Sequence, residues 1–148
     1  MSMPVTLAEQ HRLPWRRRLL PLLAVALARP LASIRPARLR RVLEFARRGA
    51  APATADQALA ARQAAVSVSL RCAGRGCLQR SIATALLCRA RGTWPTWCTG
   101  VRTQPFAAHA WIEADGQLIG ESHPKGHYRP LLTIGPQPDD HRRSHPHA

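Results

Sequence analysis

Residues 71–87 have the sequence RCAGRGCLQRSIATALL, and the rest of the chain is organised around this stretch. Two glycines loosen the backbone just before Cys77, and apolar residues then recur at helical spacing from Leu78 to Leu86. The pattern predicts a helix from Cys77 to Arg91 that ends at Gly92. Because the positive end of a helix dipole stabilises a thiolate, a cysteine at this position is expected to have a lowered pKa.

A second block, residues 105–113 with the sequence PFAAHAWIE, has the character of a strand and carries His109. The other histidines fall in the expected loop 122–127 or in the two tails. A cysteine at a helix start and a histidine on a strand are the nucleophile and base that thiol catalysis requires. Cys72 is expected to end the preceding helix and to pack there. Two simpler interpretations stay open: Cys77 as a buried structural thiol and His109 as a hydrogen-bonded core residue.

An acidic residue is needed to orient the histidine, and the sequence offers two candidates nearby. Asp115-Gly116 predicts a two-residue hairpin turn, which fully explains the aspartate. Such a turn would set His109 opposite Ser122 on the returning strand, so that Glu121 becomes an immediate neighbour of the imidazole. Glu121 is therefore the predicted third residue. Gln79 or a nearby backbone N–H group is a candidate for stabilising an oxyanion.

The chain has 148 residues, enough for one domain, and a formal net charge of +14. A balance this basic suggests a nucleic acid, an anionic membrane or an acidic peptide as a partner. Lys125 is the single lysine, so the arginine excess is better explained by the codon usage of a GC-rich genome, and nucleic acid is not the expected partner. Cys72, Cys77, Cys88 and Cys98 have the spacing of neither a secreted disulfide framework nor a zinc site. We expect reduced thiols, a cytoplasmic location, and no metal or other cofactor.

The order of the patterns predicts helices first and a small antiparallel sheet afterwards, which is an α+β class. The expected helices cover residues 13–33, 37–48, 54–71 and 77–91, and Thr54 and Gln57 form a capping box for the third. The expected strands cover residues 93–101, 107–114, 117–121 and 128–134. The predicted organisation is a flexible leader over residues 1–11 within an N-terminal helical segment 1–53, a core 54–134, and a disordered tail 135–148.

The first expected helix carries a stripe of leucines flanked by arginines. The leucines are Leu19, Leu20, Leu23, Leu27 and Leu31, and the arginines are Arg16, Arg17, Arg18 and Arg29. Three interpretations are open: the stripe packs on its own domain, docks to a partner protein, or lies on an anionic membrane surface. The run also resembles a signal peptide, but it is too short to span a bilayer, and the sequence beyond it stays basic and helical.

Several motifs together resemble the lasso peptide biosynthesis B protein, in the form in which its protease half stands alone. They are Cys-Leu-x-Arg-Ser at 77–81, Arg-x-Arg-Gly at 89–92, Gly-Val-Arg at 100–102, Pro-Phe-x-Ala-His-Ala-Trp-Ile-Glu at 105–113, and Gly-x-x-x-x-Glu at 116–121. The strong resemblance covers residues 54–134, and the N-terminal helices resemble the family in pattern only. The cysteine and histidine blocks together make the resemblance specific.

The resemblance implies a transglutaminase-like cysteine peptidase that removes the leader from a ribosomally made lasso peptide precursor. It assigns Cys77 as the nucleophile and His109 as the base, and it places Glu121 where the family commonly has an aspartate. The implied partners are the precursor peptide, a separate leader-recognition protein and an asparagine-synthetase-like cyclase. ATP is expected of that cyclase, because no phosphate-binding glycine loop is found here. The alternatives are a non-catalytic scaffold of the same fold, a basic nucleic-acid-binding protein, and an acyl transferase or amidase.

Overall fold

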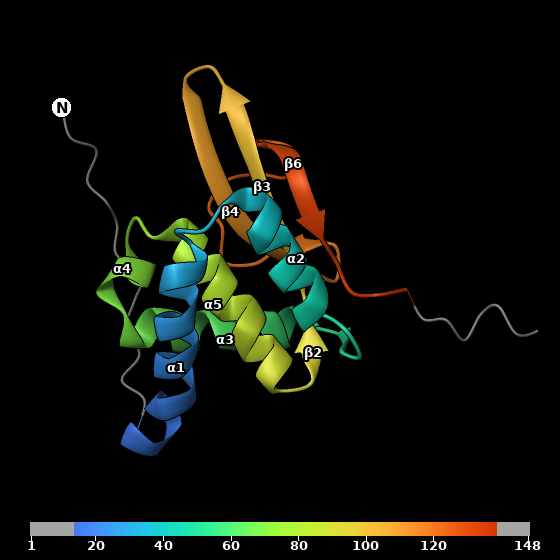
Figure 1. Ribbon diagram of the computed structural model, residues 1–148. Coiled ribbons are helices and arrows are strands. Elements are labelled where there is room, and N and C mark those ends of the chain that lie inside the picture. Colours follow the sequence, from blue (N-terminus) through green and yellow to red (C-terminus); the bar gives the residue numbers. More distant parts are fainter. Residues whose placement is uncertain (1–13, 139–148) are drawn as a thin grey trace, which may run out of the picture.

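The computed structural model describes residues 14–138, which form helices packed against one side of a small sheet (Figure 1). The helices of this part are α1 (Trp15–Leu31), α2 (Pro36–Ala46), α3 (Ala55–Val68), α4 (Leu70–Ala73) and α5 (Cys77–Ala90). The strands are β1 (Ala51–Pro52), β2 (Thr93–Trp94), β3 (Thr96–Thr103), β4 (Phe106–Ala114), β5 (Gln117–Leu118) and β6 (Arg129–Ile134). The predicted α+β class is confirmed. The predicted leader 1–11 and most of the predicted tail lie outside the described residues.

Helix α5 lies at the centre of the structure, between α1, α3 and the inner face of β4 (Figure 1). Its bounds agree with the predicted helix, and Gly92 ends it with a φ of +86°. Ile82 and Leu87 are fully buried in the core, while alanines along the helix allow its neighbours to approach closely. The helix that begins at Cys77 is therefore the element on which the other layers pack.

Helix α3 begins where the sequence predicts. The Thr54 hydroxyl accepts from the Gln57 N–H at 3.2 Å, and the Gln57 side chain accepts from the Thr54 N–H at 3.0 Å. The predicted continuation to Arg71 is wrong, because Ser69 takes an extended conformation (φ −142°, ψ 115°). The Ser69 hydroxyl then accepts from the Cys72 N–H at 3.2 Å and starts the short helix α4. A serine that caps a new helix breaks the long one.

The main sheet has four strands in the order β5-β4-β3-β6, and all of its pairs are antiparallel. The predicted single strand 93–101 is interrupted at Pro95, which has no N–H to donate. The part before Pro95, β2, leaves this sheet and pairs in parallel with β1, a pairing that the sequence does not signal. Strands β3 and β4 set Gly100 opposite His109.

The hairpin that joins β4 and β5 has the predicted turn. Asp115 and Gly116 both have positive φ values, 51° and 70°, as a type I′ turn requires. The predicted returning strand 117–121 is wrong beyond Leu118, because Gly120, with a φ of 65°, turns the chain out of the ladder. Ser122 is therefore not paired with His109 in the sheet. The turn at Gly120 brings Glu121 close to His109 instead.

Helix α1 leaves its leucines exposed, whereas the simplest expectation is that the leucines pack on the core. It packs on the core with the small side of the helix, through Pro21, Ala24 and Ala28. The leucines from Leu19 to Leu27 are 40–63 % exposed. Packing on the chain's own domain therefore does not explain most of the leucine stripe. Within residues 14–138, no helix is long and apolar enough to cross a membrane.

Candidate active site

Cys77 is the first residue of α5, and the turn before it is held tightly. The Gly76 N–H donates to the Arg71 carbonyl at 2.9 Å, and a Cβ at position 76 would lie 2.6 Å from the same oxygen. The buried Arg80 donates to the carbonyls of Cys72 and Gly74, at 3.0 and 3.3 Å. A glycine and a buried arginine thus place Cys77 at the helix start, where it is partly exposed.

The side chain of Cys77 contacts His109 on β4. A hydrogen bond to the His109 side chain is the main cause that lowers the pKa of Cys77 below its ordinary value of 9.0. Burial acts in the opposite direction, and the backbone N–H of Ala110 helps to stabilise the thiolate. The start of a helix favours the same ionised form. The first two residues of the predicted site are therefore brought together.

His109 also bonds to the third predicted residue. Its Nε2 lies 2.9 Å from Glu121 Oε2, so the hydrogen bond between His109 and Cys77 is assigned to the other ring nitrogen, Nδ1. Both side chains are largely buried, at 14 % and 8 % exposed. Burial alone would lower the pKa of His109, but the hydrogen bonds to Cys77 and Glu121 outweigh it and raise the pKa to about 9. The imidazole is thus held in its protonated form beside a thiol that ionises readily.

Glu121 reaches His109 because the chain turns at Gly120. A Cβ at Gly120 would lie 2.7 Å from the Arg62 guanidinium, so this arginine packs directly on the turn. Burial works against ionisation of Glu121, but the bond to His109 and the positive charges of His109, Arg80 and Arg62 lower its pKa. The carboxylate is therefore ionised and fixed, as an orienting group must be.

The sequence did not signal His123, which lies beside this group of three. His123 Nε2 is 3.4 Å from Glu121 Oε2, and its ring meets the His109 ring edge-on at 5.2 Å between centroids. The Tyr128 ring stacks on the His109 ring with 5.0 Å between centroids, and the Trp111 ring stacks on the His109 ring with 6.1 Å between centroids. The one hint in the sequence was that His123 follows Glu121 by two residues. The predicted strand gave no reason to assign His123 to the site.

A metal ion is the other ligand that these residues suggest. Ligand atoms of His109, Glu121 and His123 lie within 4.8 Å of one another, and two histidines with one carboxylate suit zinc. The Glu121 oxygen, however, is already bonded to His109, and the nearby charges of Arg62 and Arg80 oppose a dication. The arrangement fits a hydrogen-bonded Cys-His-Glu group better than a resident metal.

An apolar cavity of about 350 Å³ opens beside Cys77 and His109. It lies between the segment that joins α1 to α2 and the strands β3, β4 and β6. Apolar side chains line most of it, among them Ile34, Leu39, Val101 and Leu132. This volume suits an apolar side chain of a peptide whose carbonyl carbon lies at Cys77.

Other candidate residues have structural partners. The Gln79 amide donates to the Val25 carbonyl of α1 at 3.1 Å, so it is directed away from an oxyanion at Cys77. Asp115 accepts from the Ala55 N–H at 2.7 Å. Burial raises the pKa of Cys72, and it raises the pKa of both Cys88 and Cys98 to about 11. Among the cysteines, Cys77 is the one with a lowered pKa.

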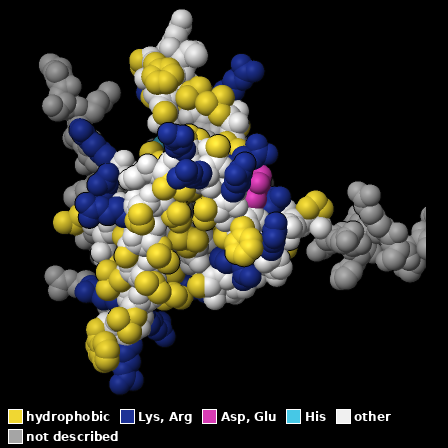
Figure 2. All heavy atoms as spheres, viewed as in Figure 1, with side chains coloured by type: hydrophobic (Ala, Val, Ile, Leu, Met, Phe, Trp, Pro, Cys, Tyr) yellow, Lys and Arg dark blue, Asp and Glu magenta, His cyan; other side chains and the backbone are white. Residues whose placement is uncertain are grey.

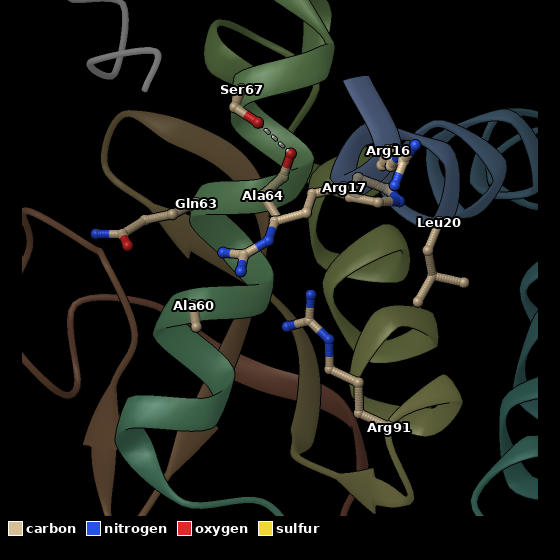
Figure 3. Close-up of a pocket in the computed structure, with 9 residues that line it drawn as sticks. Arg16, Arg17, Leu20, Ala60, Gln63, Ala64, Ser67 and Arg91 are labelled. Atoms are coloured by element: carbon tan, nitrogen blue, oxygen red, sulfur yellow. Dashed lines mark hydrogen bonds between the residues drawn. The ribbon is translucent and has the colours of Figure 1, made fainter. Parts of the chain in front are cut away.

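A second cavity, of about 540 Å³, lies between the start of α1, helix α3 and the end of α5 (Figure 3). Arg16, Arg17 and Arg91 line it, and the close-up shows the side chains of Arg17 and Arg91 extending toward α3, with Arg16 beside α1. No acidic residue is part of this lining, nor are Cys77 and His109. This basic cavity is therefore separate from the Cys-His-Glu group.

Comparison with known families finds a match over most of the chain. The family described as the Transglutaminase-like superfamily matches residues 21–133, which include Cys77, His109 and Glu121. No curated protein and no solved structure matches the chain.

Proposed function

The chain belongs to the transglutaminase-like superfamily, and we propose that it is a cysteine peptidase acting on a lasso peptide precursor. It would remove the leader from this ribosomally made peptide. A separate leader-recognition protein would deliver the precursor, and an asparagine-synthetase-like cyclase would take the product. The match to the superfamily supports the fold and the general cysteine-protease character. The lasso peptide assignment is supported by the sequence blocks around Cys77 and His109.

One observation carries the proposal: Cys77 at the start of α5 bonds to His109, whose Nε2 lies 2.9 Å from Glu121. The Cys77 thiolate would attack the carbonyl carbon of the scissile bond, and the His109 imidazolium would give its proton to the leaving amine. A water molecule, deprotonated by His109, would then hydrolyse the thioester and release Cys77. Glu121 would hold the imidazole in position through both steps.

The oxyanion of each step needs hydrogen-bond donors close to Cys77. Since the Gln79 side chain is hydrogen-bonded to α1, we assign stabilisation of the oxyanion to backbone N–H groups. The Cys77 N–H donates to the Arg75 carbonyl at 2.9 Å, so the donors in the proposal are the N–H groups of Leu78 and Gln79. These lie in the first turn of α5, have no carbonyl four residues earlier within the helix, and point toward the helix start. The apolar cavity beside Cys77 would bind a side chain next to the scissile bond.

The test is mass spectrometry of a precursor peptide from the same gene neighbourhood. The peptide is incubated with this protein and the neighbouring leader-binding chain, and Cys77→Ala is compared with Cys72→Ala. We expect cleavage at one bond, lost in Cys77→Ala and kept in Cys72→Ala. If no protein cleaves the peptide although the leader-binding chain is bound, the non-catalytic scaffold becomes the better explanation. If Cys77→Ala still cleaves, the assignment of the nucleophile is wrong.

A further inference from the structure

The outer face of α1 is unusual because it is apolar and points away from the core. We define this outer face by Trp15, Leu19, Leu22, Leu23 and Leu27, which are 46–70 % exposed. The opposite side of the same helix, with Pro21, Ala24 and Ala28, is the side that is buried. A surface helix normally shows the reverse arrangement, with its apolar side on the core. An apolar face of this kind marks a contact with something outside the chain.

Positive charge surrounds this outer face. Arg29 lies on one border of this face, and Arg16 lies near the other border, between Leu23 and Leu27 around the helix. The Arg16 guanidinium lies over the Trp15 ring, 5.3 Å from its centroid. Between residues 15 and 48 the chain has ten arginines and a single acidic residue, Glu44, which is bonded to Arg40. Among the salt bridges within residues 14–138, none involves an arginine of α1. Figure 2, which has the same view as Figure 1, shows a hydrophobic band along α1 with Lys and Arg side chains on both sides.

We propose that the outer face of α1 binds an anionic lipid surface, with the leucines in the acyl boundary and the arginines at the headgroups. Apolar contact and arginines without an acidic partner on one helix are the two features that such binding combines. Trp15, at the end of the face, is an amphipathic ring of the kind that lies at a membrane interface. The helix would lie along the surface, in agreement with the absence of a membrane-spanning helix among the described residues. The proposal goes beyond the proposed peptidase activity and does not depend on it.

The charge favours a lipid surface over a second copy of the chain. A copy would bring its own arginines to the same contact, and the described part of α1 has no acidic residue to pair with them. An anionic bilayer supplies negative charge along the whole helix, on both of its borders. Its acyl layer also accepts a convex row of leucines, which needs no complementary groove.

The protein contains its own reporter for this experiment. Trp15 is 70 % exposed, whereas Trp94, Trp97 and Trp111 are 0–3 % exposed. A water-soluble quencher such as iodide therefore acts mainly on Trp15. The intact chain is mixed with vesicles of equal parts phosphatidylglycerol and phosphatidylcholine, and with vesicles of phosphatidylcholine alone. Co-sedimentation measures binding, and iodide quenching measures whether Trp15 has left the water.

Two pairs of variants separate apolar contact from charge. Leu19→Ser with Leu23→Ser removes outer-face leucines at constant charge, and Leu70→Ser with Phe106→Ser does the same to exposed residues elsewhere. Arg16→Gln with Arg29→Gln removes two charges beside the face, and Arg75→Gln with Arg129→Gln removes two charges elsewhere. Circular dichroism checks that each variant is folded.

We expect binding to the anionic vesicles at physiological salt, with Trp15 protected from iodide. The leucine variant should bind at least about tenfold more weakly, and the Arg16/Arg29 variant roughly tenfold more weakly. Both controls should stay close to wild type. Three results would overturn the proposal. They are no binding to anionic vesicles, binding that leaves Trp15 open to iodide, and a dimer in solution that the leucine variant abolishes. Binding that leaves Trp15 open to iodide would indicate adsorption by charge alone. A dimer that the leucine variant abolishes would indicate a contact between copies of the chain.

Discussion

Cys72 and Cys77 lie on two neighbouring helices, α4 and α5, which residues 74–76 join, yet their thiols are opposite in character. Cys72 is fully buried, and burial raises its pKa. Cys77 is partly exposed, and the hydrogen bond to His109 lowers its pKa. Both have positively charged arginines in their surroundings. The difference indicates that the hydrogen bond to His109, rather than the basic environment, lowers the pKa of Cys77.

The largest expected effect is the loss of precursor cleavage in Cys77→Ala. Removing the sulfur should lower the rate by roughly a thousandfold or more, because no other group can form the thioester. Cys72→Ala is the matched variant and should keep at least half of the wild-type rate. Cleavage is followed by mass spectrometry. Equal losses in the two variants would mean that the contrast between the two cysteines concerns stability and not chemistry.

A second effect, expected to be about a hundredfold, concerns Glu121→Gln. The neutral amide cannot stabilise the imidazolium of His109, so precursor cleavage should slow while the fold is kept. Glu121→Asp retains the charge but is one methylene shorter, and it should lie between wild type and Glu121→Gln. Rates for the three proteins are compared at one pH. If Glu121→Gln cleaves as fast as wild type, Glu121 does not act through His109.

A smaller effect is expected in the rate at which iodoacetamide alkylates Cys77. Since His109 is the main cause of the lowered pKa, His109→Ala should raise the pKa of Cys77 toward 9.0 and slow its alkylation at pH 7 on the order of tenfold. Cys72 should stay unmodified in both proteins until they unfold. Peptide mapping after timed alkylation distinguishes the two sites.

The same pair of groups predicts the pH dependence of cleavage in the wild type. The active form needs a thiolate and an imidazolium, so cleavage should rise as pH passes through the lowered pKa of Cys77. It should fall again above about pH 9, where His109 loses its proton. In Glu121→Gln, which lacks a charge that raises the pKa of His109, this fall should move to lower pH. An alkaline limit that stays in place would show that another group causes it.

The smallest expected effect is on stability. Cys72→Ala removes a buried sulfur from the core below α4, and it should lower the free energy of unfolding by roughly 1–2 kcal/mol. Cys77→Ala removes a partly exposed sulfur and should cost less. Urea denaturation followed by circular dichroism measures both. A larger loss for Cys77→Ala would assign a structural role to the thiol that we propose to be the nucleophile.

Features with a local cause could be predicted from the sequence. Helix α5, the capping box of α3 and the turn at Asp115-Gly116 each depend on residues within one turn of chain, and all three are found. The three side chains of the candidate site are brought together as well. Their assembly was expected from a hairpin register, however, and the structure achieves it through the turn at Gly120.

Features that depend on distant residues could not be predicted. The pairing of β1 with β2 joins segments about forty residues apart and leaves no periodic pattern in either. The orientation of α1 follows from the close packing of Ala24 and Ala28, whereas hydrophobicity alone favours burial of the leucines. His123 lies beside Glu121 in the segment after Gly120, which the sequence pattern did not place at the site. In each case tertiary packing decided between local alternatives.

The hydrogen bond from the Ala55 N–H to Asp115 has a practical consequence for engineering the protein. The tip of a hairpin is ordinarily the place to insert a tag or a fluorescent label, because a turn tolerates added residues. Here the tip is fastened to the first residue of α3, and β4 of the same hairpin carries His109. An insertion after Asp115 would release the hairpin from the helix layer.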